Sequence, residues 1–221
     1  DPALGNDKEV RIPDGTQDAL LDGKIVSLLA RDSSPPETAD DGTLLKTLDT
    51  ETGVLTTILN ICTKNQICRI LAFDGKRVLM RSEDIMGPRL WYIALASVYA
   101  PRNEFAATAY RWEKPGDKGR MLLWNDFEVS VYDPQTDQVS LITRIGTPIT
   151  GAEWDPRGND IIFSTADTIT AVELDDRDVR NTFNLARLTH LDGFSIARDG
   201  STIRFTGAIG GQGGVFEKKL E

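Results

Sequence analysis

The segment Asp155-Pro156-Arg157-Gly158, followed by Asp160-Ile161-Ile162-Phe163-Ser164, joins a tight turn to a short apolar strand. Proline suits the second position of such a turn because its φ angle is fixed, and glycine suits the fourth. A turn of this kind followed by an apolar strand recurs at residues 22–26, 74–78, 117–121 and 199–203. The five units lie roughly 40 to 50 residues apart, a period typical of the blades of a β-propeller. The sequence therefore predicts an all-β fold built from five similar modules.

Each module can be divided into the four short strands that a propeller blade requires. In the fourth module the expected strands are residues 149–154, 160–164, 168–174 and 179–185. The third of these strands alternates polar and apolar residues, as a strand packed on one face does. Glycine and proline are spread along the chain rather than gathered in a linker, so one domain covering residues 1–221 is expected. The predicted blades are approximately residues 16–62, 63–104, 105–146, 147–187 and 188–221.

The fifth module has only three expected strands, at residues 192–197, 202–206 and 214–219. The N-terminal residues 8–13 contain Glu9-Val10-Arg11-Ile12, which has no local partner. Pairing of this segment beside the last strand would close the ring and cover an edge that promotes aggregation. We therefore predict a closed five-bladed propeller, the alternative being five blades of a larger ring. The glycine-rich residues 207–214 are interpreted as a long hairpin loop, because no helix follows that could cradle a phosphate.

Composition limits the classes of function. The chain has 221 residues, of which 40% are hydrophobic and 27% charged, enough for a sizeable core. Its net charge of −9 makes nucleic acid a poor partner and is interpreted as a solvated surface. No apolar run reaches the roughly 20 residues of a membrane span. The chain opens on Asp1-Pro2 without an initiator Met, so we expect a mature or excised segment whose upstream part, including any membrane anchor, has been removed.

The two cysteines, Cys62 and Cys68, are separated by five residues that include Lys64-Asn65-Gln66, a sequence typical of a turn. Two strands joined by such a turn can bring the sulfur atoms together, so a disulfide is predicted. A disulfide indicates an oxidising compartment. The alternative is a pair of reduced, buried thiols. A metal site is not expected, because the only histidine, His190, lies far away in the sequence.

Two passages carry a family resemblance, one at residues 123–134 with Leu123-Trp124-Asn125-Asp126 and one at residues 148–158. They resemble WD40-like or TolB-type propeller repeats, in particular the propeller region of bacterial PEGA-domain proteins. The similarity extends from about Tyr110 to Leu185, and the Pro-Glu-Gly-Ala motif of that family is absent. Because such propellers are commonly membrane-anchored and lie outside the cytoplasm, the resemblance implies a bacterial, extracytoplasmic location.

Catalytic motifs are scarce in this sequence. It has no Gly-x-Ser-x-Gly elbow, and His190 has no Ser or Cys partner at a recognisable spacing. The run of residues 175–178 is interpreted as a solvated turn rather than a calcium loop, because it lacks the spaced ligands of such a loop. No cofactor is expected. A hydrolase of glycan or lactone type would use carboxylates near the propeller axis, for which the candidates are Asp18, Glu153, Asp155 and Asp192.

The leading hypothesis is a non-enzymatic extracytoplasmic scaffold that binds a protein or a cell-envelope polymer, and a hydrolase is the alternative. A spacer between an anchor and a partner domain also fits the sequence, and the oligomeric state is left open. A rigid ring holds its connecting loops in a fixed array, and residues 32–41 and 96–104 are the two longest irregular segments. The tryptophans are interpreted as core residues, except that Trp112 is placed in a loop. The candidate binding residues are Ser33, Pro35, Glu37, Tyr99, Arg102 and Trp112.

Overall fold

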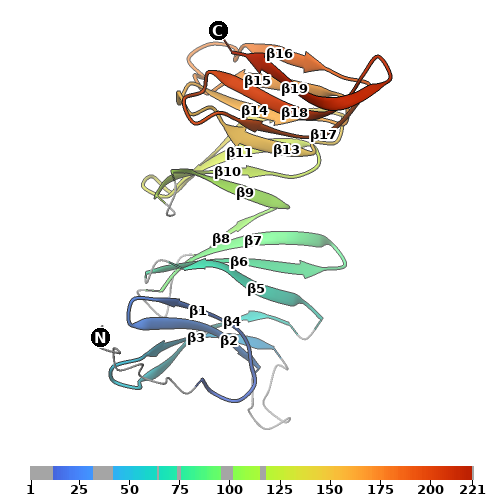
Figure 1. Cartoon of the computed structure of the whole chain (residues 1–221). Coiled ribbons are helices and arrows are strands. Elements are labelled where there is room, and N and C mark those ends of the chain that lie inside the picture. Colours follow the sequence, from blue (N-terminus) through green and yellow to red (C-terminus); the bar gives the residue numbers. More distant parts are fainter. Residues whose placement is uncertain are drawn as a thin grey trace, which may run out of the picture. The chain divides into compact units, whose positions relative to one another are not determined.

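The structure, a computed structural model, describes residues 12–31, 42–63, 65–73, 76–95, 102–114 and 118–220, with the side chains of Arg102 and Lys118 excepted. All regular elements of this part are β-strands, and they form five antiparallel sheets (Figure 1). Nothing in it is a helix of the length and apolarity that a membrane crossing needs. The chain divides into two compact units, residues 1–106 and 107–221, which are described separately.

The first unit contains two sheets, in each of which four strands follow one another in chain order. The first sheet consists of β1 (Thr16–Asp22), β2 (Ile25–Arg31), β3 (Thr43–Asp49) and β4 (Leu55–Cys62). The second consists of β5 (Ile67–Phe73), β6 (Arg77–Asp84), β7 (Gly87–Ala94) and β8 (Arg102–Phe105). Each sheet is thus a simple antiparallel meander, the arrangement of a propeller blade.

The second unit contains three sheets of the same kind. The third sheet of the chain consists of β9 (Ala109–Lys114), β10 (Lys118–Trp124), β11 (Glu128–Asp133) and β12 (Gln138–Arg144). The fourth consists of β13 (Gly151–Trp154), β14 (Asp160–Ser164), β15 (Thr168–Glu173) and β16 (Thr182–Arg187). The fifth consists of β17 (His190–Ile196), β18 (Thr202–Ile209) and β19 (Gln212–Lys219).

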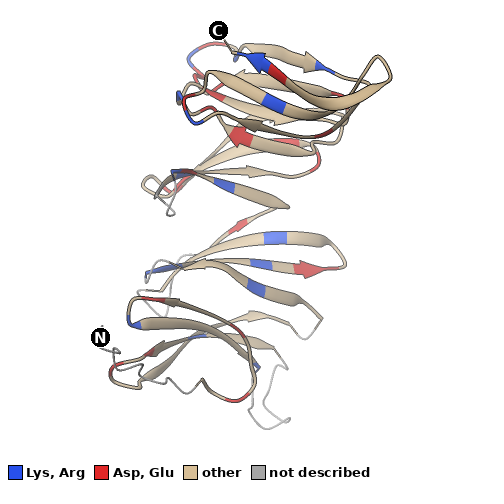
Figure 2. Cartoon of the chain, viewed as in Figure 1, with Lys and Arg blue, Asp and Glu red and all other residues tan. Residues whose placement is uncertain are grey.

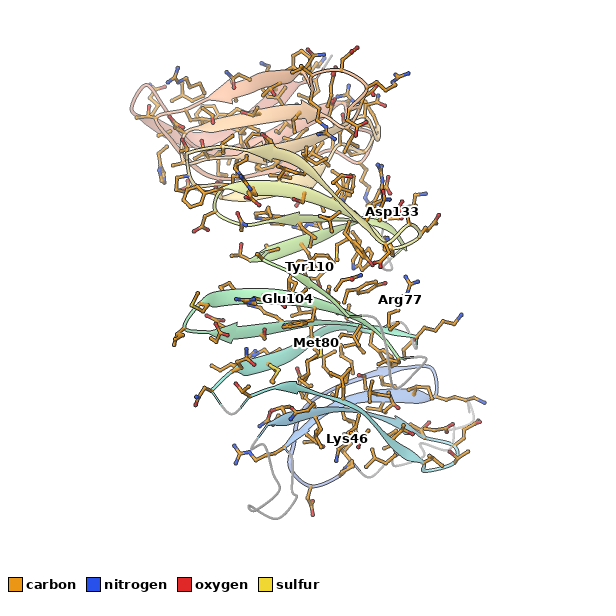
Figure 3. The ribbon with its side chains drawn as sticks, turned by 180° about the vertical axis from the view of Figure 1, so that it is seen from behind. Lys46, Arg77, Met80, Glu104, Tyr110 and Asp133 are labelled. Atoms are coloured by element: carbon orange, nitrogen blue, oxygen red, sulfur yellow. A yellow bond between two sulfur atoms is a disulfide. The ribbon has the colours of Figure 1, made fainter. Side chains whose placement is uncertain are left out.

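Apolar packing between consecutive sheets forms the cores of both units. In the first unit, Leu29 and Leu45 of the first sheet pack with Val78 and Met80 of the second (Figure 3 labels Met80). In the second unit, one cluster joins the third sheet to the fourth and another joins the fourth to the fifth. Burying one such side chain contributes about 1.5–3 kcal/mol, so these contacts are the main force that stacks the sheets.

The burial pattern of the second strand in a sheet shows whether one or both faces of that sheet are covered by a neighbouring sheet. In β14, Ile161, Ile162 and Phe163 are all buried, because this strand has a neighbouring sheet on each face. In β18 burial alternates instead: Ile203 and Phe205 are buried against the fourth sheet, whereas Arg204 between them is exposed. The fifth sheet therefore buries one face, in agreement with the alternating pattern of its sequence.

The prediction of an all-β propeller-type fold with five blades is confirmed, with three strands in the fifth sheet and four in each of the others. The predicted closing segment lies mostly outside the described residues: only residues 12 and 13 are described, and neither is in a strand. The interpretation of residues 207–214 as a long loop was wrong. Strand β18 runs to Ile209 and β19 starts at Gln212, so only Gly210 and Gly211 form the turn. Both have positive φ angles, 58° and 84°, which a two-residue hairpin turn of this kind requires and glycine supplies.

Candidate binding groove

The second unit has a cavity of about 1260 Å³ along the first strands of its three sheets. These strands are β9, β13 and β17, and the turn that follows β13 completes the wall. Figure 2 shows basic colour on β9 and acidic colour on β13, whose one acidic residue is Glu153, and Figure 3 labels Tyr110 of β9. We call this cavity the groove. Its lining residues are Tyr110, Arg111, Trp112, Glu113, Lys114, Glu153, Trp154, Asp155, Pro156, Gly158, Ser195, Ile196 and Arg198.

Trp154 fixes the position of β13 against β9. Its indole Nε1 donates a 3.0 Å hydrogen bond to the backbone carbonyl of Arg111. The guanidinium of Arg120 lies 5.1 Å from the centroid of the Trp154 ring, within cation–π range. The Trp154 side chain is buried, and its hydrogen bond satisfies an N–H group that burial would otherwise leave unpaired. This part of the groove wall is therefore held rigidly.

Glu113 on β9 is neutralised by Arg120 on β10. The guanidinium donates from Nη2 to Oε1 at 2.7 Å and from Nε to Oε2 at 3.2 Å, and the backbone N–H of Arg120 also donates to Oε2. These bonds lower the pKa of Glu113, chiefly through the guanidinium, and raise the pKa of Arg120. The pair therefore stays ionised at neutral pH and is poorly suited to transferring protons.

Asp155 in the turn after β13 is neutralised by Arg157. Its side chain is only 1% exposed and accepts hydrogen bonds from the backbone N–H, Nε and Nη2 of Arg157 at 3.0–3.2 Å. The hydrogen bonds to Asp155 raise the pKa of Arg157. This ion pair packs against Gly200 of the equivalent turn in the fifth sheet, where a Cβ atom would come within 2.8 Å of Arg157 Cγ. The repeated turns of the two sheets therefore contact each other.

The charges of the groove are unequally balanced. The third carboxylate of the lining, Glu153, pairs with Arg111 at 2.7 Å. Each of the three lining carboxylates thus has an arginine partner. Lys114 and Arg198 also line the groove and are exposed, and neither forms an ion pair with another described residue. The lining holds three basic and three acidic side chains, but Arg120 and Arg157 from outside the lining pair with Glu113 and Asp155, so Lys114 and Arg198 are left without an ion pair among the described residues.

The four carboxylates proposed for a hydrolase are divided between the two units. Asp18 belongs to the first unit, where its Oδ2 accepts a hydrogen bond from the backbone N–H of Ile70. Glu153 and Asp155 line the groove with their arginine partners, whereas Asp192 lies outside its lining, exposed beside His190 at 3.0 Å. Within the described residues, no three His, Cys, Asp or Glu side chains are grouped as a metal site needs.

The structure places one of the six predicted binding residues in the groove. Trp112 lines it and is half-buried, but it belongs to strand β9 rather than to a loop. Arg102 begins β8, and nothing is described of its side chain. The remaining four residues, Ser33, Pro35, Glu37 and Tyr99, lie outside the described residues.

Sequence reasoning missed the cationic residues of the groove. Neither Lys114 nor Arg198 is among the candidate binding residues that the sequence indicates. A usable signal was present in their repeat positions, since both flank the first strand of a module. Lys114 ends the first strand of the third sheet and Arg198 follows the first strand of the fifth, so both line one cavity only because the fourth sheet stacks between these sheets.

The predicted disulfide between Cys62 and Cys68 is confirmed. It joins the last residue of β4 to the beginning of β5, and therefore links the first sheet to the second. Both cysteines are buried in the apolar cluster between these sheets, and their Cα atoms are 6.6 Å apart. The bridge thus lies within the core of the first unit rather than in an exposed loop.

The blade-type antiparallel sheets define an all-β fold of the propeller class. No family model and no curated protein matches the chain. Among solved structures it is similar to TolB from Acinetobacter baumannii, with 20% identity over 88% of the chain and a TM-score of 0.47. It is also similar to the Dos1 propeller (13% identity over 86%, TM-score 0.49) and to the tricorn protease (11% over 93%, TM-score 0.44). The chain spans 50% of the first two structures and 25% of the third.

Proposed function

We propose that this chain is a non-enzymatic binding scaffold whose groove takes an acidic segment of a partner protein. The observation that carries the proposal is the charge arrangement of the groove. Its carboxylates are paired with arginines, whereas Lys114 and Arg198 form no ion pair with the described residues. A carboxylate of the partner would supply the missing counter-charge, and complementary charge also speeds the encounter of the two proteins.

The size and lining of the groove fit a peptide segment better than a sugar. At about 1260 Å³ the groove exceeds the usual volume of a small-molecule pocket. A sugar would need an open aromatic face, but Trp154 is buried and its ring is covered by Arg120. Tyr110 and Trp112 are half-buried, so each can present an edge to an apolar side chain of the partner.

An extracytoplasmic location is part of this proposal. A buried disulfide persists in oxidising compartments and is rare in the cytosol, so the Cys62–Cys68 bridge supports it. The resemblance to the propeller region of PEGA-domain proteins agrees with the same location. A thiol titration of the unfolded, unreduced protein isolated from its native source tests this part. Two free thiols would contradict an oxidising location.

Affinity capture from a native envelope extract, with the whole chain as bait, tests the groove. Arg198→Glu and Lys114→Glu are the test variants. Arg187→Glu is the matched control, because Arg187 is exposed on β16, lies outside the groove lining and undergoes the same change of charge. We expect one protein to be retained by the wild type and by the control, and its affinity to fall about tenfold in each test variant, which is about 1.4 kcal/mol.

Three outcomes would contradict the proposal. Equal retention by all four baits would place the binding surface elsewhere. Recovery of a polymer without protein would favour the alternative of a cell-envelope ligand. Turnover of a glycan or lactone that is lost in Glu153→Gln would favour the hydrolase hypothesis, since that substitution removes the one lining carboxylate that pairs with Arg111.

A further inference from the structure

The fifth sheet ends on a strand that has a partner on one side only. In the described part of the chain this sheet has the order β17-β18-β19, whereas each of the other four sheets has four strands. Strand β19 is eight residues long, and seven of these residues are exposed. It is therefore an edge of the kind to which another extended chain can add.

The hydrogen-bond pattern shows which backbone groups of β19 face outward. The backbone N–H of Leu220 donates to the carbonyl of Ser201, and Ile209 is opposite Gln212 at the two-residue turn. Hydrogen-bonded and non-hydrogen-bonded pairs alternate in an antiparallel ladder, so Phe216 and Lys218 bond to β18. The residues between them point their N–H and C=O groups away from β18. These residues are Gly213, Val215, Glu217 and Lys219.

A cavity of about 530 Å³ lies beside this edge, between β19 and the outer strand of the fourth sheet. Phe183 and Leu185 of β16 belong to its apolar lining, together with Ile162, Ala171 and Leu220. Its charged lining consists of Asp155, Arg157, Asp160, Lys218 and Lys219. Phe183 is opposite Ala171, which packs towards the fifth sheet, yet Phe183 itself is 50% exposed. A fourth strand beside β19 would place alternate side chains over Phe183.

We propose that the outer edge of β19, which pairs with no strand of the described residues, binds an extended segment of a partner protein as the fourth strand of this sheet. Asp155 lines both this cavity and the groove, but the strand edge itself belongs to β19, which does not line the groove, and the proposal does not rest on the proposed function of the groove. Main-chain hydrogen bonds to Val215 and Glu217 hold the segment, one apolar side chain enters the cavity over Phe183, and an acidic side chain faces Lys219. Lys219 forms no ion pair with another described residue. In strand addition of this kind, the backbone provides affinity and the pocket provides specificity.

A second copy of the chain fits this edge poorly. The side chains that β19 would bring to the cavity are those of Gly214, Phe216 and Lys218. Phe216 is already stacked on Phe205, with ring centroids 5.7 Å apart. Lys218 already donates from Nζ to the carbonyl of Leu185 at 2.6 Å, and Gly214 has no side chain to fill the space. The segment expected to close the ring, residues 8–13, is shorter than β19 and ends on a proline, which has no N–H to donate.

Hydrogen exchange of the whole chain with a synthetic peptide tests the proposal. The probe is a capped ten-residue peptide of alternating Val and Thr that carries one Leu and one Glu, and the control peptide is N-methylated at every second residue. We expect the amides of Val215 and Glu217 to exchange freely in the protein alone and at least tenfold more slowly with the probe. The amides of Phe216 and Lys218 should be protected throughout.

A pair of variants separates backbone pairing from side-chain effects. Glu217→Pro removes an outward N–H while leaving the bonds to β18 in place, and Glu217→Ala is the control. Both lose the ion pair with Arg204. We expect the probe to bind at least tenfold more weakly to Glu217→Pro than to Glu217→Ala. Equal binding to the two variants, no slowing by the probe, or slowing by the N-methylated peptide would overturn the proposal. Amides of Val215 and Glu217 that are already protected in the free chain would do so too, since the edge would then be occupied.

Discussion

The carboxylate of Asp18 in β1 accepts a 2.8 Å hydrogen bond from the backbone N–H of Ile70 in β5, the first strand of the next sheet. Its other oxygen accepts a bond of 2.9 Å from the N–H of Ala19. In the second unit, Trp154 of β13 donates to the carbonyl of Arg111 in β9 in an equivalent way. In each unit, a side chain on the first strand of one sheet thus bonds to the backbone of the first strand of a neighbouring sheet. Apolar packing is non-directional, so bonds of this kind set the register between sheets.

Replacing Asp18 tests this bond in the first unit. We expect Asp18→Ala to lower the free energy of unfolding by about 1–3 kcal/mol, because the N–H of Ile70 loses a charged acceptor. Asp22→Ala is the control, since Asp22 is an exposed carboxylate at the end of the same strand and should change stability by less than about 0.5 kcal/mol. Urea unfolding with an unchanged m-value measures both. Equal losses in the two variants would mean that the bond does not stabilise the unit.

Replacing Trp154 tests the corresponding bond in the second unit. Trp154→Phe keeps an aromatic ring but removes the N–H that bonds to the Arg111 carbonyl, so we expect a loss of about 1–3 kcal/mol. The control is Arg111→Lys, which keeps that carbonyl and weakens the pairing with Glu153. Because Arg111 is more than half exposed, its ion pair should contribute less than about 1 kcal/mol. A larger loss in the lysine variant than in Trp154→Phe would refute this account.

The contact between the turns of the fourth and fifth sheets can be tested with two glycines. Gly200 has a φ of +71°, and a Cβ there would lie 2.8 Å from Arg157 Cγ and 3.0 Å from Asp155 Oδ1. Gly158 has a φ of +83°, but a Cβ there would have no atom within 4 Å. Both substitutions by alanine should therefore cost about 1–2 kcal/mol from backbone strain. We expect Gly200→Ala to lower the melting temperature further than Gly158→Ala does. Equal shifts of the melting temperature would contradict a close steric contact between the two turns.

The sequence predicted the repeated architecture because its signal is local. A turn such as Asp155-Pro156-Arg157-Gly158 and the strand after it identify a module without reference to any distant residue. The groove could not be found in this way, because Lys114 and Arg198 belong to different modules. Periodicity tells which face of a strand is buried, but it does not tell which flanking residues of separate sheets come together.

The glycine-rich hairpin shows a second limit of local reasoning. Glycine in a loop and glycine in a strand look the same in a sequence, although the physical reasons for them differ. At Gly210 and Gly211 the turn needs positive φ angles. At Gly207, within β18, a Cβ atom would collide with the backbone carbonyl of His190, where the register of β17 and β18 shifts. Only the structure shows that Gly207 serves this close approach rather than a loop.

The stability of the fold depends on pH through the buried carboxyl group of Asp160. Burial raises the pKa of Asp160 above its usual 3.8, and the charges of Asp155 and Glu173 add to this effect. Glu173 is directly opposite Asp160 in the ladder of β14 and β15, a position where like charges destabilise a sheet. The folded chain therefore holds this proton more tightly than the unfolded chain, and the contribution of Asp160 to stability falls as the pH rises through its raised pKa.

Asp160→Asn removes the buried charge and its repulsion by Glu173, so we expect it to raise the urea midpoint of unfolding at neutral pH. The gain should shrink as the pH falls towards the ordinary pKa of an aspartate, because the wild-type side chain is then protonated in both states. Asp175→Asn is a control of opposite sign. Hydrogen bonds from the Arg177 side chain lower the pKa of Asp175 to about 2. Removing this carboxylate should therefore reduce stability at neutral pH and have no effect in strong acid. A gain from Asp160→Asn that is constant from neutral to acidic pH would show that packing, rather than the charge, is responsible.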